Sequence, residues 1–232
     1  MSATEDLFER WAPQYDAWFD SADGQPLFES EVSCIRRVLP TKCRPWLEVG
    51  VGTGRFAQAL GVEVGIDPAA RPLSLAAGRG VTVVQACGEA LPFACSQFEV
   101  ALVVVTLCFA PQPLPLLQES ARVLTDDGRV VLGLVLADRP WGHHYARLGE
   151  AGHRFYSRAR FYTMEEVRQL AAEAGLTIAA AACTLSQQPQ RPPFVVEDPR
   201  DGLDPRASFV AVSLAKVGAQ GSRKTRPAGC PA

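Results

Sequence analysis

Two patterns of apolar residues alternate along most of the chain. Between residues 44 and 182, short runs that are apolar throughout are separated by segments whose apolar residues recur every three or four positions. Continuous apolar runs are typical of strands covered on both faces, and the longer period is typical of amphipathic helices. This alternation predicts a parallel sheet with helices on both faces. The expected strands cover residues 46–49, 62–66, 81–85, 98–105, 129–136 and 177–182, with a last strand at 207–214.

Helical spacing is clearest towards the two ends of this pattern. The apolar residues of positions 1–40 predict two helices, the second of which covers residues 26–39. Further along, Thr163 and Glu166 have the spacing of a capping box, so a helix is expected to begin there. Gly175 supplies its stop.

These elements fit one generous domain with elaborations, as the length of 232 residues suggests. A helical cap over residues 1–40 is expected to precede a core over residues 41–216. Within that core, residues 138–163 are too long for a simple connection and are expected to be a functional insertion. Residues 187–206, rich in proline and charge, are typical of a long loop. The polar tail, residues 217–232, is expected to be disordered.

Composition and charge narrow the classes of function. The hydrophobic fraction of 47% and the charged fraction of 21% are ordinary for a globular domain. A formal net charge of -2 predicts no strong attraction to phosphate backbones, so no nucleic acid partner is expected. No apolar run approaches the roughly 20 residues that span a bilayer, and the acidic N-terminus lacks a signal-peptide layout. We therefore expect a cytoplasmic protein without a membrane span; the oligomeric state stays open.

The seven cysteines are scattered and include no C-x-x-C pair. Cys34, Cys87 and Cys108 lie in apolar stretches of sequence, where cysteine behaves as a small hydrophobic residue. We therefore expect reduced structural thiols and no metal site.

The segment LEVGVGTGRFA, residues 47–57, ends an expected strand in three glycines: Gly50, Gly52 and Gly54. Glycine suits a turn with unusual backbone angles, and it lets a ligand approach the main chain closely. Asp67 stands at the end of the next expected strand, where a carboxylate can accept both hydroxyls of a ribose. A tight turn and a helix cap would explain the two features separately. Together they indicate a site for an adenosine-containing cofactor.

Two positions beside the glycines discriminate between cofactors. A dinucleotide fingerprint requires a glycine where Arg55 stands. Glu48 would repel a pyrophosphate, but it suits a ligand that carries an ammonium and a sulfonium. These residues favour S-adenosylmethionine over NAD.

An ordered series of motifs resembles the class I S-adenosylmethionine-dependent methyltransferases, especially the branch grouped with the ubiquinone/menaquinone methyltransferases. It covers roughly residues 8–135 and comprises EVGVGTG, GIDP, CGEALPF, FEVALVVVTLCF and ESARVLTDDGRVVL. The resemblance implies methyl transfer from S-adenosylmethionine by an α/β protein with a Rossmann-like seven-stranded, mostly parallel sheet. The implied strand order is 3-2-1-4-5-7-6 with the last strand antiparallel, helices on both faces and an N-terminal helical cap.

The resemblance also assigns a cofactor site. The glycine loop and Glu48 would line the methionine end, Asp67 would bind the ribose, and Gly88 with Glu89 would border the adenine. The aromatic ring of Tyr15 would close over the cofactor, although plain helix packing explains it equally well. The complete expected set is Tyr15, Glu48, Gly50, Gly52, Asp67, Pro68, Gly88, Glu89, Thr106 and Leu107.

The acceptor of the methyl group has to be inferred from weaker signals. The exit of the fourth expected strand, VTLCFAP, lacks the Asn/Asp-Pro-Pro-aromatic turn typical of enzymes that methylate bases. A small-molecule acceptor is therefore expected. Residues 138–163, the expected acceptor-side insertion, hold all three histidines, and the candidate catalytic residues are His143, His144, His153 and Tyr156. Surface packing of these side chains is an equally good interpretation.

Other interpretations stay open at this point. Arg154, Arg158 and Arg160 make the insertion locally basic, which suits an anionic acceptor. The chain can also be a non-catalytic protein that binds S-adenosylmethionine or S-adenosylhomocysteine. A nucleotide-dependent oxidoreductase is the less favoured alternative.

Overall fold

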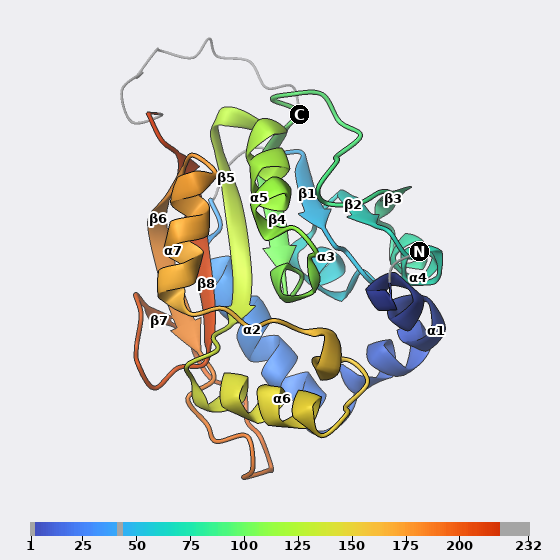
Figure 1. Ribbon diagram of the computed structural model, residues 1–232, viewed down its shortest axis with the longest axis vertical. Coiled ribbons are helices and arrows are strands. Elements are labelled where there is room, and N and C mark those ends of the chain that lie inside the picture. The colour runs from blue at the N-terminus through green and yellow to red at the C-terminus, as the bar shows by residue number, and fades with distance from the viewer. Residues whose placement is uncertain (1–2, 41–43, 219–232) are drawn as a thin grey trace.

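The computed structural model describes residues 3–40 and 44–218. The segment expected to be a disordered tail, residues 217–232, lies outside this part from residue 219 onward. A single sheet runs through the molecule (Figure 1). Its strands are β1 (Trp46–Val49), β2 (Val64–Asp67), β3 (Thr82–Gln85), β4 (Phe98–Val104), β5 (Leu124–Val135), β6 (Leu176–Thr184), β7 (Arg200–Asp201) and β8 (Phe209–Lys216).

The sheet order is β3-β2-β1-β4-β5-β8-β6-β7. The first five strands in that order pair in parallel, and β8 is antiparallel to both β5 and β6. Because β8 is the seventh of the expected strands, the implied order 3-2-1-4-5-7-6 is confirmed. The expectation of seven strands is wrong by one. Two residues of the loop over 187–206 form β7, which pairs with the end of β6.

Helices form a layer on each face of the sheet and a further group at one end (Figure 1). None of the helices in the described part of the chain is long and apolar enough to cross a membrane. The helices are α1 (Ala3–Trp18), α2 (Gly24–Val38), α3 (Arg55–Leu60), α4 (Ala70–Gly78), α5 (Pro113–Arg122), α6 (Pro140–Glu150) and α7 (Met164–Glu173), with 3-10 turns η1 (Leu107–Phe109) and η2 (Tyr156–Arg158).

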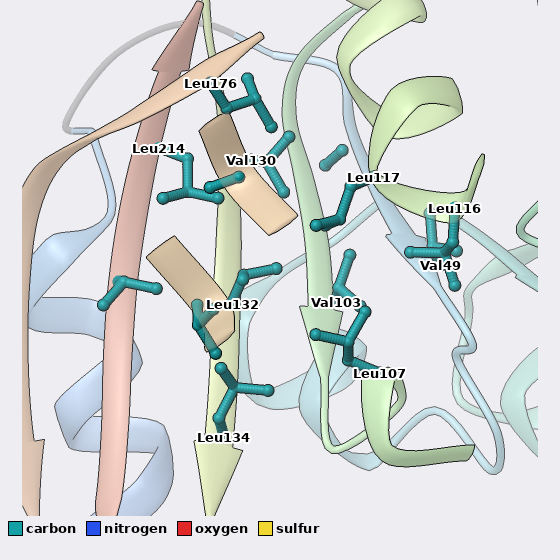
Figure 2. Packing of buried hydrophobic residues seen from close by; sticks show 14 of the residues in the cluster. Val49, Val103, Leu107, Leu116, Leu117, Val130, Leu132, Leu134, Leu176 and Leu214 are labelled. Carbon is teal, nitrogen blue, oxygen red and sulfur yellow. The ribbon is translucent and has the colours of Figure 1, made fainter. Parts of the chain in front are cut away.

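Alternate residues of the central strands point into two separate hydrophobic clusters. On one face, α5 and α7 pack over β4, β5 and β8 (Figure 2). On the other face, α2 packs against β5, β6 and β8, α4 packs against β2 and β3, and α3 completes the second cluster. Burial on both faces explains why the central strands are apolar throughout. The capping box expected at Thr163 and Glu166 is present at the start of α7.

Two helices, α1 and α6, lie at the end of the sheet rather than on one of its faces (Figure 1). Of the two N-terminal helices, α2 packs against β5, β6 and β8, whereas α1 lies beside α4, near the ends of β1 and β2 (Figure 1). Helix α6 lies beyond the end of β5 (Figure 1). Residues 138–163 are not one long loop, because α6 and η2 form within them. Pro140 starts α6, where a missing N–H is harmless. Carboxyl ends of parallel strands and two helices thus surround one region of the molecule.

Candidate functional site

A cavity of about 390 Å³ lies where β1, β2 and β4 end. Its walls come from the glycine loop after β1, the end of β2, the loop after β3, the exit of β4 and α1. Crevices at the carboxyl ends of the strands are the usual ligand sites of open α/β sheets. Of the expected cofactor-binding residues, those that line the cavity are Tyr15, Glu48, Gly50, Gly52, Asp67, Pro68, Gly88, Glu89 and Thr106.

Leu107 is the exception among the expected cofactor residues. Its side chain is fully buried in the hydrophobic cluster beside Val103 (Figure 2), and it does not line the cavity. The chain turns into η1 at this point, so consecutive residues face opposite ways. Thr106 faces the cavity and Leu107 faces the core. The prediction that the Leu107 side chain faces the cofactor is therefore wrong.

The glycine loop is shaped by close approach as well as by backbone angle. Gly50 has φ +76°, and a Cβ atom there would lie 2.2 Å from Cγ2 of Thr106. The Thr106 hydroxyl lies within hydrogen-bond distance of two carbonyl oxygens, that of Gly50 at 3.2 Å and that of Val104 at 3.0 Å, and its one proton is shared between them. Gly52 also has positive φ, +51°, but a Cβ there would meet no atom within 4 Å. The loop is therefore held against β4 at Gly50 and is open to a ligand at Gly52.

Asp67 connects this loop to the helix that follows β2. One carboxylate oxygen accepts from the Gly52 N–H at 3.0 Å and the other accepts from the Ala69 N–H at 2.9 Å. Burial of the carboxyl group raises its pKa to about 6. The Asp67 side chain thus orders the start of α4 and lines the cavity as well, so the capping and ligand-binding interpretations are compatible.

Glu48 is the most unusual side chain of this cavity. It is 1% exposed, and its Oε2 atom has no hydrogen-bond partner in the described part of the chain. Desolvation raises the pKa of Glu48 well above its usual range. A buried acceptor without a partner is destabilising, and a ligand ammonium would supply the missing donor. The site therefore fits the amino-acid end of S-adenosylmethionine, and the ribose fits at Asp67.

An ion network that the sequence analysis did not anticipate joins α1 to the glycine loop. Asp16 on α1 pairs with Arg55 at 2.9 Å and with Arg79 at 2.8 Å, and these three side chains are 15% to 17% exposed. Asp20 pairs with the same Arg55 guanidinium, and Arg79 also donates to the Thr53 carbonyl at 2.6 Å. In the sequence, Asp16 and Asp20 stand four residues apart on one helix face, and this spacing could have indicated such an ion network. The arginine that replaces the dinucleotide glycine thus anchors α1.

A second cavity, of about 860 Å³, adjoins the first. Both are lined by the same five residues, which therefore lie between them: Tyr15, Phe19, Phe56, Val105 and Phe109. Aromatic rings from α1, α6 and η2 and from the loop after β6 contribute much of the remaining wall, among them Trp18, Trp141, Tyr145, Tyr156 and Phe194. A ligand in the second cavity could thus reach a ligand in the first.

The four candidate catalytic residues do not share one location. His144, His153 and Tyr156 line the second cavity, and Tyr156 stacks on Tyr145 with ring centroids 4.2 Å apart. His143 is exposed on the outer side of α6 and does not line it, so the structure contradicts an acceptor contact for His143. Adjacent helical residues point about 100° apart, which separates it from His144.

Charged and thiol side chains of this region also differ from expectation. Arg158 and Arg160 are exposed, and Arg160 pairs with Glu166, so neither supports an anionic acceptor. Arg154 does line the second cavity, but its guanidinium lies 3.6 Å from the ring centroid of Trp11. Cys87, expected in apolar surroundings, is exposed at the mouth of the first cavity. Sequence reasoning missed both carboxylates of the second cavity: Glu31 on α2 and Asp23 just before this helix.

Comparisons with known proteins agree with this geometry. A family model described as a methyltransferase domain matches residues 47–132. An uncharacterized protein of Mycobacterium tuberculosis is 42% identical over 204 residues, 88% of this chain and 72% of that protein. An uncharacterized protein of Methanocaldococcus jannaschii is 32% identical over 211 residues, 91% of this chain and 99% of that protein.

A solved structure from Thermotoga maritima carries the same fold over nearly its whole length. That protein is described as a SAM-dependent methyltransferase, possible histamine N-methyltransferase. It has a TM-score of 0.84 and 31% identity, with 92% of this chain and 99% of that chain covered. Membership of the ubiquinone/menaquinone branch stays a prediction. The methyltransferase family model and this relative show that the chain belongs to the class I S-adenosylmethionine-dependent methyltransferases.

Proposed function

We propose that this protein transfers a methyl group to a small-molecule acceptor held in the second cavity. The observation that carries the proposal is the shared wall between the two cavities, formed by Tyr15, Val105, Phe109 and their neighbours. A cofactor at Glu48 and Asp67 would present its reactive end to this wall. A protein that only binds the cofactor has no need of a second, adjoining chamber.

The chain's own residues define how the cofactor would be held. Glu48 would accept from the amino group of its methionine portion, Asp67 would accept from the ribose hydroxyls, and Gly88 with Glu89 would border the adenine. When bound, S-adenosylmethionine supplies an electrophilic methyl group on a positively charged sulfur, and transfer is an in-line displacement. Since the leaving group is already activated, the protein contributes chiefly by positioning the acceptor and excluding water.

The aromatic wall of the second cavity supports a small acceptor. Phe8 and Tyr15 of α1 meet Phe155 at ring-centroid distances of 5.5 Å and 5.4 Å, so α1 and the segment before η2 are joined over it. Aromatic walls of this kind exclude water and suit a compact, partly apolar molecule. The description of the Thermotoga maritima relative as a possible histamine N-methyltransferase points to the same class of acceptor. His144, His153 and Tyr156 stay candidates for contact with it.

Calorimetric titration tests the cofactor assignment directly. The wild-type protein should bind S-adenosylmethionine and S-adenosylhomocysteine and should not bind NAD. Asp67→Ala should weaken S-adenosylhomocysteine binding roughly 10- to 100-fold, because two ribose hydrogen bonds to a carboxylate are lost. Asp126→Ala, which removes an exposed carboxylate, is the matched control and should leave binding unchanged. Absence of binding by the wild-type protein, or equal binding by Asp67→Ala, would contradict the assignment.

A further inference from the structure

Glu31 is out of place in the pattern of its helix. It lies on the buried face of α2, between Leu27 and Ile35, which are almost completely buried one turn away on either side. The Glu31 residue is 8% exposed and lines the second cavity. No hydrogen bond or ion pair within residues 3–40 and 44–218 involves its carboxylate. A carboxylate on an otherwise apolar helix face, without a partner, is destabilising unless a ligand completes it.

The immediate surroundings of Glu31 are aromatic and uncharged. Tyr15, Tyr145 and Tyr156 all lie near enough for the Glu31 charge to raise the pKa of their hydroxyls, which burial raises further. These three hydroxyls therefore stay protonated at neutral pH. Tyr145 and Tyr156 are stacked at an interplanar angle of 17°. The carboxylate thus faces a wall of neutral rings.

The cationic side chains of the same cavity do not neutralise Glu31. Arg154 lies over the ring of Trp11, on the side of the cavity formed by α1. Burial lowers the pKa values of His144 and His153, so both imidazoles are predominantly neutral at neutral pH. The chamber therefore combines a buried, unpaired acid, Glu31, with aromatic faces, which attract cations through their negative π-systems, and the exposed Asp23 adds a second carboxylate to its lining. That combination selects a small organic cation over a neutral or anionic molecule.

We infer that the methyl acceptor is a protonated amine, bound through its ammonium by the Glu31 carboxylate among the tyrosine rings of the second cavity. This inference rests on the proposed function, since it names the acceptor class of the same site. Tyr15 connects the proposed amine site to the cofactor site, because it lines both cavities and lies near both Glu31 and Asp67.

Glu31 would also remove the proton that blocks the reaction. An ammonium nitrogen has no free electron pair, so it cannot accept a methyl group. In the step assigned to Glu31, an N–H bond of the ammonium breaks, an O–H bond forms on the carboxyl group, and the amine nitrogen keeps the electron pair. Burial raises the pKa of Glu31 to about 8, which suits a proton acceptor that works near neutral pH.

Other titratable groups face the same space and have to be considered in any pH profile. They come from every element that surrounds Glu31: Tyr15 on α1, Asp23 and Cys34 on or beside α2, Cys108 on η1, His144 and Tyr145 on α6, His153 and Arg154 before η2, and Tyr156 on it. Burial lowers the pKa values of the two histidines below their ordinary range. Gln substitutions at His144 and His153 would identify their contribution.

The test measures binding without turnover. The protein is saturated with S-adenosylhomocysteine and titrated calorimetrically with 2-phenylethylamine, tryptamine and histamine, and with 2-phenylethanol and 3-phenylpropionate as neutral and anionic counterparts. We expect at least one amine to bind at least about 10-fold more tightly than either counterpart. Glu31→Gln should lose that preference, Glu31→Asp should retain part of it, and S-adenosylhomocysteine should bind all variants alike. Glu29→Gln, an exposed carboxylate on the same helix, is the control.

Proton release gives a second readout that a merely structural role for Glu31 would not change. At pH 7 the Glu31 carboxyl is largely protonated, so the pair formed with an ammonium must lose one proton. Titrations in buffers of different ionisation enthalpy should show this release in the wild type and not in Glu31→Gln. If S-adenosylhomocysteine binds and no amine does, or the neutral or anionic compound binds equally well, the amine inference is overturned while the proposed function survives. If S-adenosylhomocysteine itself fails to bind, the proposed function fails first.

Discussion

At the scale of single residues, Gly50 combines two constraints that can be separated by mutation. Gly50→Ala should destabilise the protein and weaken S-adenosylhomocysteine binding by at least roughly 10-fold. A non-glycine residue at positive φ costs about 1–2 kcal/mol, and the new Cβ would also lie 2.2 Å from Thr106, which must move. Gly80→Ala is the matched control, because Gly80 has φ +86° with no atom within 4 Å of an added Cβ.

Thermal unfolding and calorimetric titration of both glycine variants distinguish the two effects. Gly80→Ala should lower stability by about 1 kcal/mol and leave cofactor affinity unchanged. If Gly50→Ala behaves in the same way, the contact with Thr106 does not shape the cofactor loop. If Gly80→Ala also weakens binding, the loss is a general consequence of reduced stability.

The residues of the site differ in how readily they can be recognised from the sequence. Asp67 and Glu48 could be found because each stands at a fixed place relative to a strand end and a glycine loop. Glu31 stands at helical spacing between the apolar residues Leu27 and Ile35, which is a signal in the sequence, but this spacing does not show that the face lines a cavity. Only the tertiary structure turns that face of α2 towards a cavity. Leu107 was assigned wrongly because a one-residue rotation at η1 separates cavity from core.

At the scale of secondary-structure elements, α1 is held over the cofactor cavity mainly by Asp16. Asp16→Asn should lower the free energy of unfolding by about 2 kcal/mol, because two partly buried guanidinium groups lose a charged partner. It should also weaken S-adenosylhomocysteine binding several-fold, since Tyr15 on the same helix lines the cavity. The control is Asp6→Asn, which breaks the exposed pair with Arg10 on α1 and should cost under about 1 kcal/mol.

Limited proteolysis in the presence and absence of S-adenosylhomocysteine shows whether α1 itself is released. Asp16→Asn should be cut faster within α1 than the wild type, and ligand should slow that cleavage. Equal cleavage rates for the Asp16 and Asp6 variants would mean that the ion network does not anchor the helix.

Most elements could be predicted from the apolar pattern, and α6 shows where this reasoning stops. Trp141, Tyr145 and Leu148 follow helical spacing, but Gly142 and Gly149 lower the helix propensity of the segment. The glycines are needed for tertiary packing: a Cβ at Gly142 would lie 2.0 Å from the Leu136 carbonyl oxygen. A local pattern cannot show that a helix breaker has been placed for a close contact elsewhere.

At the scale of the whole molecule, the strand order could be obtained from family resemblance alone. Periodicity identifies β8 as a strand but does not say that it enters between β5 and β6. The additional strand β7 could not be foreseen, since it is two residues long and is stabilised by a side chain that is far away in the sequence. Asp201 in β7 accepts from Arg37 on α2 at 2.7 Å and 2.9 Å. Pairings across more than a hundred residues depend on the assembled fold.

The distribution of buried acids over the whole molecule predicts an unusual dependence of stability on pH. Burial raises the pKa values of Glu31 to about 8 and of Asp67 to about 6, and it raises that of Glu48 as well. The folded state therefore binds more protons than the unfolded state from about pH 4.5 upward, and stability falls as the pH rises towards 8. Asp16 acts oppositely, since its arginine partners hold its pKa near 2, but its contribution is complete above its ordinary value of 3.8.

We expect the free energy of unfolding, measured by urea denaturation without ligand, to fall by on the order of 3 kcal/mol between pH 5 and 8. Glu31→Gln should flatten this decline, because its neutral side chain no longer titrates, whereas Glu29→Gln should leave it unchanged. Saturating S-adenosylhomocysteine should make the free energy of unfolding fall less steeply with pH, because the Glu48 carboxylate then gains a hydrogen-bond donor. A wild-type stability that is constant or rises over this range would mean that these carboxyl groups are solvated. It would contradict the conclusion that burial raises their pKa values.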